Sequence, residues 1–372
     1  LKFARTAADY LISISQPADA PLAYMPPTYQ GVHYTAKSNA GPQMMLYPAA
    51  AASAYLTLYE AVKDEKYRVT VFAGGGITVE ANGAIDATEK GYASGKGPGK
   101  STSGFDGSGR ACHGGGYNPG CCYGSMLCPT NCGTGHVSVG GGAIRLVTGG
   151  TLRVDGTVAA DAGASTVTCS GAGGSVWVTA GRISGTGAIT ANGGTTTSDS
   201  WPTTGGGGRV AVWLTDPDAD FSQCDVTRIA AFGGDLKQVI RSAAGTVYLK
   251  TGAQAEDEGT LVIANSNAVA VTRYQTEIGS DMETVRVGSV VIRDAGRLRI
   301  RPGHRIEVSG DWTNAGGSLQ ADAGSVVELV TAADAHIVGT NTFDTLVCTV
   351  GGKKLSFGTT GTKTAIADNG KL

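Results

Sequence analysis

A glycine cluster followed by a short apolar strand recurs along the middle of this chain. The copies read GGGAIRLV, GAGGSVWV and GGGGRVAVWL, and a fainter fourth copy reads AAGTVYL. Alignment on Ile144, Val176, Val210 and Val247 separates successive copies by 32, 34 and 37 residues. A strand-bearing repeat of this length is typical of solenoids, in which no repeat buries its own apolar face and the stacking of neighbours makes the core. The repeat therefore predicts a mainly β solenoid, and it constrains architecture more than activity.

The composition suits stacked strands. Glycine contributes 58 of the 372 residues without the three-residue period of collagen, and charged side chains make up only 16%. Small and β-branched residues fit closely stacked strands. Because the net charge is −2 and no apolar run reaches the roughly 18 residues of a membrane span, we expect no nucleic-acid partner and no membrane span. The sequence begins at Leu1 without a signal-peptide pattern, so we expect a mature or excised piece of a longer protein.

Residues 1–68 have a helical pattern. Apolar side chains keep helical spacing near 1–16 and near 43–66, which predicts two helices. Between them, Tyr24, Tyr29 and Tyr34 are candidates to stack on sugar rings, or alternatively to pack the loop onto the helices. The pattern ARTAADYLIS…LAYMPPTY…LYPAAAASAYLTLYEAVKDEKYR resembles one helical hairpin of the α/α-toroid domains of polysaccharide lyases and related glycosidases. Since a toroid needs more than two helices, we expect a cap or a toroid remnant.

From residue 69 to residue 372 the pattern is that of short strands and turns. VTVFAGGGITVEANGAIDATEKGYASGKGPG begins the stretch, and TLRVDGTVAADAG and RISGTGAITANGG repeat its theme. From about residue 285, the segments VVIRDAG, RLRIRPG, HRIEVSG and SLQADAG place a strand roughly every eight to ten residues. The stretch resembles glycine-rich right-handed β-helix modules of large secreted bacterial surface proteins. This resemblance implies a right-handed parallel β-helix over 69–372, preceded by the short α-helical hairpin.

Five of the eight cysteines are clustered in one glycine-rich segment. They are Cys112, Cys121, Cys122, Cys128 and Cys132. Residues 93–140 have too few apolar side chains to order themselves by burial, so we expect disulfides typical of an oxidising compartment, with at least one bridge among these five. The connectivity stays open, although neighbouring Cys121 and Cys122 are expected to take different partners. Zinc bound with the help of His113 and His136 is a second possibility, but paired C-x₂-C elements are missing. Buried thiols are the third.

Three aspartates alternate in the segment TDPDADF. Asp216, Asp218 and Asp220 are spaced like the first ligands of a calcium loop, where carboxylate oxygens bind a hard cation. The glycine expected at the sixth position of such a loop is Phe221, and the glutamate expected at the twelfth is Thr227. A solvated loop is therefore the alternative to calcium, and apart from this possible calcium we expect no cofactor.

Arginines alternate with apolar residues in GRLRIRPGHRI. Alternation directs Leu298 and Ile300 inward, and it directs the arginines outward along one strand. These arginines are Arg297, Arg299, Arg301 and Arg305. Guanidinium groups pair with carboxylates and sulfates, so the row is a candidate site for an acidic polysaccharide. The alternative is a solvated face in which the arginines pair with Glu307 and Asp294.

No nucleophile motif or phosphate-binding loop occurs in its proper context. We therefore expect a noncatalytic extracellular solenoid, secreted or at the cell surface, that is a structural, adhesive or carbohydrate-associated module of a larger surface protein. Its partner would be a polysaccharide or a cell-surface glycan. The alternative is a lyase or glycoside hydrolase acting on an acidic polysaccharide, which would need acidic residues and a basic residue facing each other across a cleft. The sequence leaves open whether the chain is an enzyme.

Overall fold

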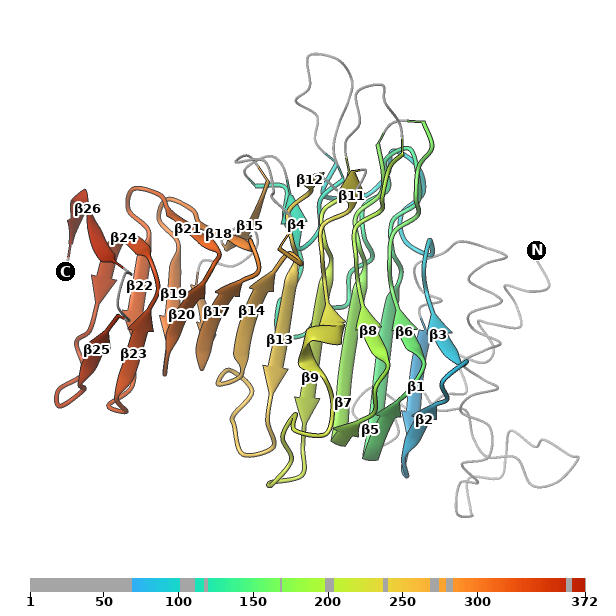
Figure 1. The fold of residues 1–372 in the computed structure, drawn as a ribbon, viewed down its shortest axis with the longest axis horizontal. Coiled ribbons are helices and arrows are strands. Elements are labelled where there is room, and N and C mark those ends of the chain that lie inside the picture. Colours follow the sequence, from blue (N-terminus) through green and yellow to red (C-terminus); the bar gives the residue numbers. More distant parts are fainter. Residues whose placement is uncertain are drawn as a thin grey trace, which may run out of the picture.

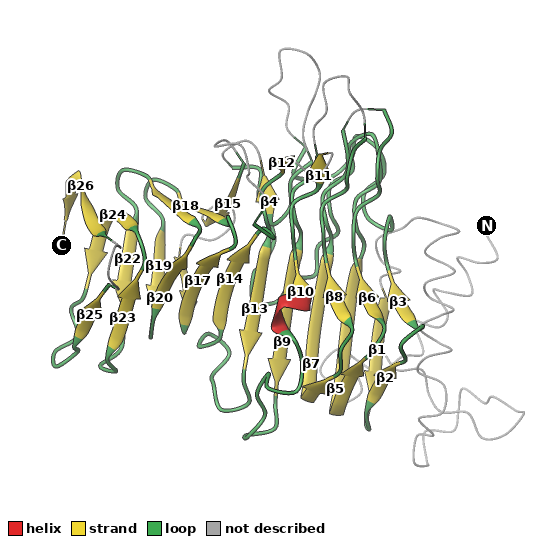
Figure 2. Ribbon diagram, viewed as in Figure 1, coloured by secondary structure: helices red, strands yellow, loops and turns green. Residues whose placement is uncertain are grey.

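The computed structural model describes residues 69–100, 111–116, 120–167, 169–197, 204–236, 240–267, 274–278, 284–358 and 363–371. Within these residues the chain is mainly β, its sheets are mostly parallel, and the only helical element is the short 3₁₀ turn η2 (Val226–Arg228) (Figure 2). The hairpin predicted over 1–68, with Tyr24, Tyr29 and Tyr34, lies outside the described residues. Its prediction is therefore untested.

One long sheet runs along the molecule, with its strands side by side along the longest axis (Figure 1). Its eleven described strands are β1 (Val69–Ala73), β2 (Ile77–Val79), β5 (Ala143–Val154), β7 (Ser175–Ser184), β9 (Arg209–Leu214), β13 (Thr246–Lys250), β14 (Thr260–Ala264), β17 (Ser289–Arg293), β20 (Trp312–Ala315), β23 (Ala335–Val338) and β25 (Leu355–Phe357).

The alignment of the glycine–strand repeats is confirmed residue by residue. Ile144 pairs with Val176, Val176 with Val210, and Val210 with Val247, each in parallel register. Strands that are more than thirty residues apart in the sequence are thus nearest neighbours in the long sheet. The register is set by the buried valine and isoleucine row, because a slip of one residue would turn that row to the other side of the sheet.

Smaller sheets cover the long sheet. On one side lies a four-stranded parallel sheet of β3 (Ala84–Asp86), β6 (Thr157–Ala159), β8 (Ala188–Thr190) and β10 (Ile229–Ala230). On the other side lie a sheet of β4 (Gly115–Gly116), β15 (Gln275–Ile278), β18 (Arg297–Ile300) and β21 (Ser318–Ala321), and a sheet of β16 (Thr284–Val287), β19 (Arg305–Val308), β22 (Val326–Leu329), β24 (Asn341–Val347) and β26 (Thr364–Lys371). A small antiparallel pair joins β11 (Asp235–Leu236) and β12 (Ile240–Arg241).

The two sides of the long sheet carry two separate apolar cores. The first core contains Val176 and Val247, together with residues of the β3-β6-β8-β10 sheet. The second core contains Tyr248, Leu261 and Trp312, together with residues of the two later sheets. Successive side chains of a strand point to opposite faces, so neighbours such as Val247 and Tyr248 belong to different cores. We call these sides of the long sheet the first face and the second face.

The long sheet changes direction between β13 and β14, which pair antiparallel. The strands before this step are parallel to one another, and so are the strands after it. The prediction of a parallel β-helix that continues without interruption over 69–372 is therefore wrong at this position. The reason is the short connection over 251–259, because a parallel neighbour needs a crossover of a dozen or more residues. Tyr248 holds the connection: its hydroxyl donates to the Glu256 carbonyl at 2.6 Å and accepts from the Gly259 N–H at 2.7 Å.

The glycine clusters form a closely packed layer of backbone next to the first core. The Gly141 N–H donates to the Ala172 carbonyl of the next repeat at 2.9 Å, and the Gly142 N–H donates to the Ala87 carbonyl at 2.8 Å. The same two directions of bonding recur at Gly173, Gly174, Gly207 and Gly208. In this layer backbone atoms pack against backbone atoms in place of side chains, and this is the physical reason why the layer is rich in glycine.

Candidate functional site

The cysteine-rich segment contains one disulfide in the described part of the chain, between Cys112 and Cys121. The Cα atoms of the two cysteines lie 5.8 Å apart, and the bond closes a short loop. The expectation of at least one bridge among the five cysteines is confirmed, and Cys121 does not bond to its neighbour in the sequence. Cys122, Cys128 and Cys132 carry thiols, of which the first and the last are buried.

Apolar burial also orders this segment, which corrects the expectation that cross-links alone would do so. Tyr123 is buried, and its hydroxyl donates to the Cys132 carbonyl at 2.7 Å. Met126 belongs to the second core, which also contains Trp213 of β9. The buried Arg209 donates from Nε to the Tyr123 carbonyl at 2.9 Å. The segment therefore lies on the second face of the long sheet, and its few large side chains pack against that face.

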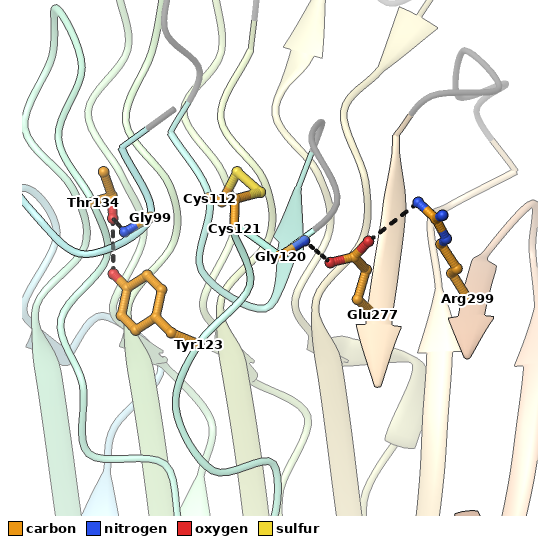
Figure 3. The surroundings of a disulfide bond; sticks show 8 residues. All are labelled: Gly99, Cys112, Gly120, Cys121, Tyr123, Thr134, Glu277 and Arg299. Atoms are coloured by element: carbon orange, nitrogen blue, oxygen red, sulfur yellow. Dashed lines mark hydrogen bonds and ion pairs between the residues drawn. A yellow bond between two sulfur atoms is a disulfide. The ribbon is translucent and has the colours of Figure 1, made fainter. Parts of the chain in front are cut away.

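The same segment reaches across to the strands that follow the change of direction. Gly115 and Gly116 of β4 pair antiparallel with Thr276 and Gln275 of β15. Just beyond β4, the Gly120 N–H donates to Glu277 Oε2 at 2.7 Å, beside the disulfide (Figure 3). These contacts, between residues more than 150 positions apart, connect the earlier and later strands of the molecule.

A polar cluster surrounds Glu277, which is the best-defined candidate site in the described residues. Arg299 of β18 lies between two carboxylates, with NH1 3.5 Å from Glu277 Oε1 and Nε 2.7 Å from Asp322 Oδ2. Gln320 donates to Asp322 Oδ1 at 2.8 Å and accepts a hydrogen bond from Gln275. We refer to Gln275, Glu277, Arg299, Gln320 and Asp322 as the polar cluster. Its members come from β15, from β18 and from the end of β21.

The electrostatics of the polar cluster depend on the burial of Glu277, whose side chain is only 3% exposed. Burial raises the pKa of Glu277 above its usual value, because a charged carboxylate loses hydration there. The Gly120 N–H, Arg301 and Arg299 act in the opposite direction, and nearby Asp322 adds to the increase. A carboxyl of this kind keeps its proton to a higher pH than an exposed one does.

The arginines of the candidate row do not lie on a single strand. Arg297 and Arg299 belong to β18, Arg301 follows the end of that strand, and Arg305 belongs to β19 in a different sheet. Alternation is correct within β18, where Leu298 and Ile300 are buried. The prediction that these arginines lie along one strand is wrong, because the chain turns after Ile300 and continues into a strand of another sheet.

The partners of these arginines also differ from those expected. Arg299 pairs with Glu277 and Asp322, and Arg305 pairs with Glu328 of β22. Asp294 instead pairs with its neighbour Arg293. The actual partners sit one repeat away in the sequence, where only strand pairing brings them into contact.

The aspartates proposed for calcium are held by an arginine and by their own loop. Arg182 of β7 pairs with Asp216, with Nε 3.0 Å from Oδ2, and also with Asp218. Asp220 accepts a hydrogen bond from the Ser222 backbone N–H at 3.0 Å. In the described ranges, no group of three or more His, Cys, Asp and Glu side chains could hold a metal ion. The loop therefore places the three carboxylates in contacts within the protein, and calcium binding there stays a prediction.

Sequence reasoning missed Glu277, Asp322, Gln275 and Gln320. Each is a single polar residue in or next to a short strand, and nothing in its local sequence distinguishes it from a solvated position. The available signal was the spacing, since Glu277, Arg299 and Gln320 are separated by 22 and 21 residues, which is one repeat of the later strands. The structure aligns these three positions across β15, β18 and β21.

No helix within the described residues has the length and apolarity to cross a membrane. Comparison with protein families, with curated proteins and with solved structures finds no match for this chain.

Proposed function

We propose that this chain is a noncatalytic, extracellular structural module, built as a right-handed parallel β-helix that is interrupted by the antiparallel β13–β14 pair, and that it serves as a stalk or adhesive part of a larger surface protein. The observation that carries the proposal is the repeated in-register parallel pairing along the long sheet. In such stacking each repeat is held by both of its neighbours, so the stabilising terms of the repeats and of their interfaces add up along the molecule. A rigid spacer needs this property and no assembled catalytic group.

Two further features support an extracellular location. The Cys112–Cys121 disulfide suits an oxidising compartment, where such bonds persist. The close backbone packing of the glycine layer leaves little room for local opening, which favours resistance to proteases outside the cell.

The test is turnover of polysaccharides by the purified chain. A panel of uronic-acid and sulfated polysaccharides is incubated with it, and new unsaturated ends and new reducing ends are measured. We expect no turnover above a heat-denatured sample. Turnover that disappears in Glu277→Gln but persists in Arg305→Ala would establish an enzyme and overturn the noncatalytic proposal.

The polar cluster favours a second candidate function, the binding of a glycan without cleavage. Gln320 is exposed, and Arg299 and Asp322 are partly exposed beside it, so the cluster presents both donors and acceptors to solvent. Because Arg299 already pairs with two carboxylates, the cluster favours a neutral or weakly charged glycan over a polyanion. In affinity electrophoresis, a polysaccharide in the gel that retards the parent chain should no longer retard the Gln320→Ala variant. It should still retard the Thr342→Ala variant, which is changed at an exposed position. Equal retardation of the two variants would exclude the cluster as the binding site.

A further inference from the structure

The first core ends at a pocket between the long sheet and the segment that contains η2. The pocket has a volume of about 300 Å³. One wall is made by Phe221, which precedes η2, by Ile229 of β10, and by Phe232, which follows β10. The opposite wall is the first face of β13, β14 and β17. Beyond β10, no further described strand extends the β3-β6-β8-β10 sheet over this face.

The sheet wall of the pocket continues the first core past the point where the β3-β6-β8-β10 sheet ends. Val247, Val262 and Val291 follow one another across three neighbouring strands, and Leu249 and Ala264 lie beside them. Val247 and Val262 belong to the first core, and Leu249, Ala264 and Val291 pack against it and are only partly buried. The pocket surface is therefore mostly hydrocarbon, which favours apolar ligands and gives a sugar few partners for its hydroxyl groups.

The polar groups at the rim are bonded within the protein. Gln254 Oε1 accepts from the Thr251 backbone N–H at 2.9 Å and from its hydroxyl at 3.0 Å. Arg293 forms an ion pair with Asp294. A charged ligand would have to displace one of these contacts, whereas an uncharged ligand leaves them in place.

From these observations we infer that the pocket binds a small uncharged apolar molecule, a compact aromatic or short aliphatic compound. Its size follows from the volume: an apolar cavity of about 150 Å³ holds benzene, so this pocket has room for a body about twice as large. The site lies apart from the polar cluster, so its occupation is independent of any glycan bound there.

The experiment uses the full chain and the neutral fluorophore N-phenylnaphthylamine, with naphthalene as a competitor. Ala264→Phe fills the pocket from the sheet wall and should weaken fluorophore binding at least tenfold. The matched control is Ala315→Phe at an exposed position of β20 in the same sheet, which should leave binding unchanged. Val291→Thr keeps the shape of the side chain but adds a hydroxyl, and should weaken binding severalfold while retaining the fold.

Saturable binding of one fluorophore per chain, displaced by naphthalene and weakened in both pocket variants, supports the inference. Equal binding in folded Val291→Thr and the parent chain places the fluorophore elsewhere and overturns it, as does the absence of a fluorescence increase. Gel filtration gives a further outcome: a dimer that Val291→Thr or Ala264→Phe converts to a monomer would show that a second copy covers the pocket, which also overturns it.

Discussion

Gly141 shows at the scale of a residue why this chain needs so much glycine. Its N–H bonds to the Ala172 carbonyl at 2.9 Å, so it cannot move away from the next repeat without losing that bond. A Cβ atom added at Gly141 would overlap the carbonyl oxygen of Ala160 and crowd the backbone nitrogen of Gly174. Close approach of three backbone segments, not a turn, excludes larger residues here.

The substitution Gly141→Ala should therefore destabilise the protein by about 1–3 kcal/mol, which is typical of overpacking in a tight interior. Gly75→Ala is the matched control, because a Cβ atom at Gly75 meets nothing within 4 Å. Urea denaturation followed by circular dichroism measures both. Equal midpoints for the two variants would contradict the close-packing account.

The burial of Glu277 leads to a prediction about how the stability of the protein depends on pH. Its pKa is raised above the ordinary 4.5 by burial, so the folded state binds the proton more tightly than the unfolded state does. The contribution of this carboxyl to stability is therefore fully present below pH 4.5 and is lost as the pH rises through the folded pKa. Glu277→Gln imitates the protonated form and keeps an acceptor for the Gly120 N–H. As the pH rises above 4.5, the melting temperature of the variant should rise relative to that of the parent chain. Melting temperatures of the two proteins that change with pH in parallel would refute this.

At the scale of elements, β4 and the cysteine-rich segment connect strands on the two sides of the change of direction. β4 has only two residues, and it pairs with β15 at a position that its own sequence does not specify. The disulfide lies next to β4 and shortens the chain that must be ordered to make this pair. β4 brings no apolar side chain to this pair, so we expect the disulfide to contribute to holding it against β15, whose Ile278 is buried in the second core.

Replacing Cys112 and Cys121 together by serine should lower stability by roughly 2–3 kcal/mol, the value for closing a loop of about ten residues. Hydrogen exchange should become faster at the β4–β15 pair and at the Gly120 N–H, while the amides of β7 and β9 stay protected. If the amides of β7 and β9 lost protection to the same degree, the disulfide would support the whole sheet and not this contact.

At the scale of the whole molecule, the long sheet joins two cores that lie on its opposite faces. The first core ends near β13 and β14, where the second begins. Both faces of the sheet are buried at this junction, as the positions of Val247 and Tyr248 show. Strands far from the junction contact only their neighbours, so their stabilities should be local.

Ile337→Ala in β23 removes a buried side chain of the second core, which should cost about 2–5 kcal/mol. We expect faster hydrogen exchange in β20, β23 and β25 and little change in β5 and β7. Leu146→Ala in the first core is the matched variant and should show the reverse pattern. Identical exchange patterns for both variants would mean that the molecule unfolds as a single unit.

The sequence by itself determined the strand repeat and its register. The alignment of Ile144, Val176, Val210 and Val247 is the pairing found in the long sheet, because burial of one β-branched residue per repeat allows a single register. The sequence also indicated the closely spaced strands after residue 285 and the disulfide in the cysteine-rich segment. Each of these signals is contained in a short local pattern or in a regular spacing.

Only the tertiary structure decided the change of direction after β13, the transfer of the core to the second face, and the polar cluster. The connection over 251–259 is short, but the sequence does not show which strands pair, and its effect becomes visible only when β13 and β14 pair antiparallel. Glu277 meets Arg299 and Gly120 because strands from distant repeats and a long loop converge on it. Such contacts depend on the combined geometry of many repeats, so no local sequence pattern predicts them.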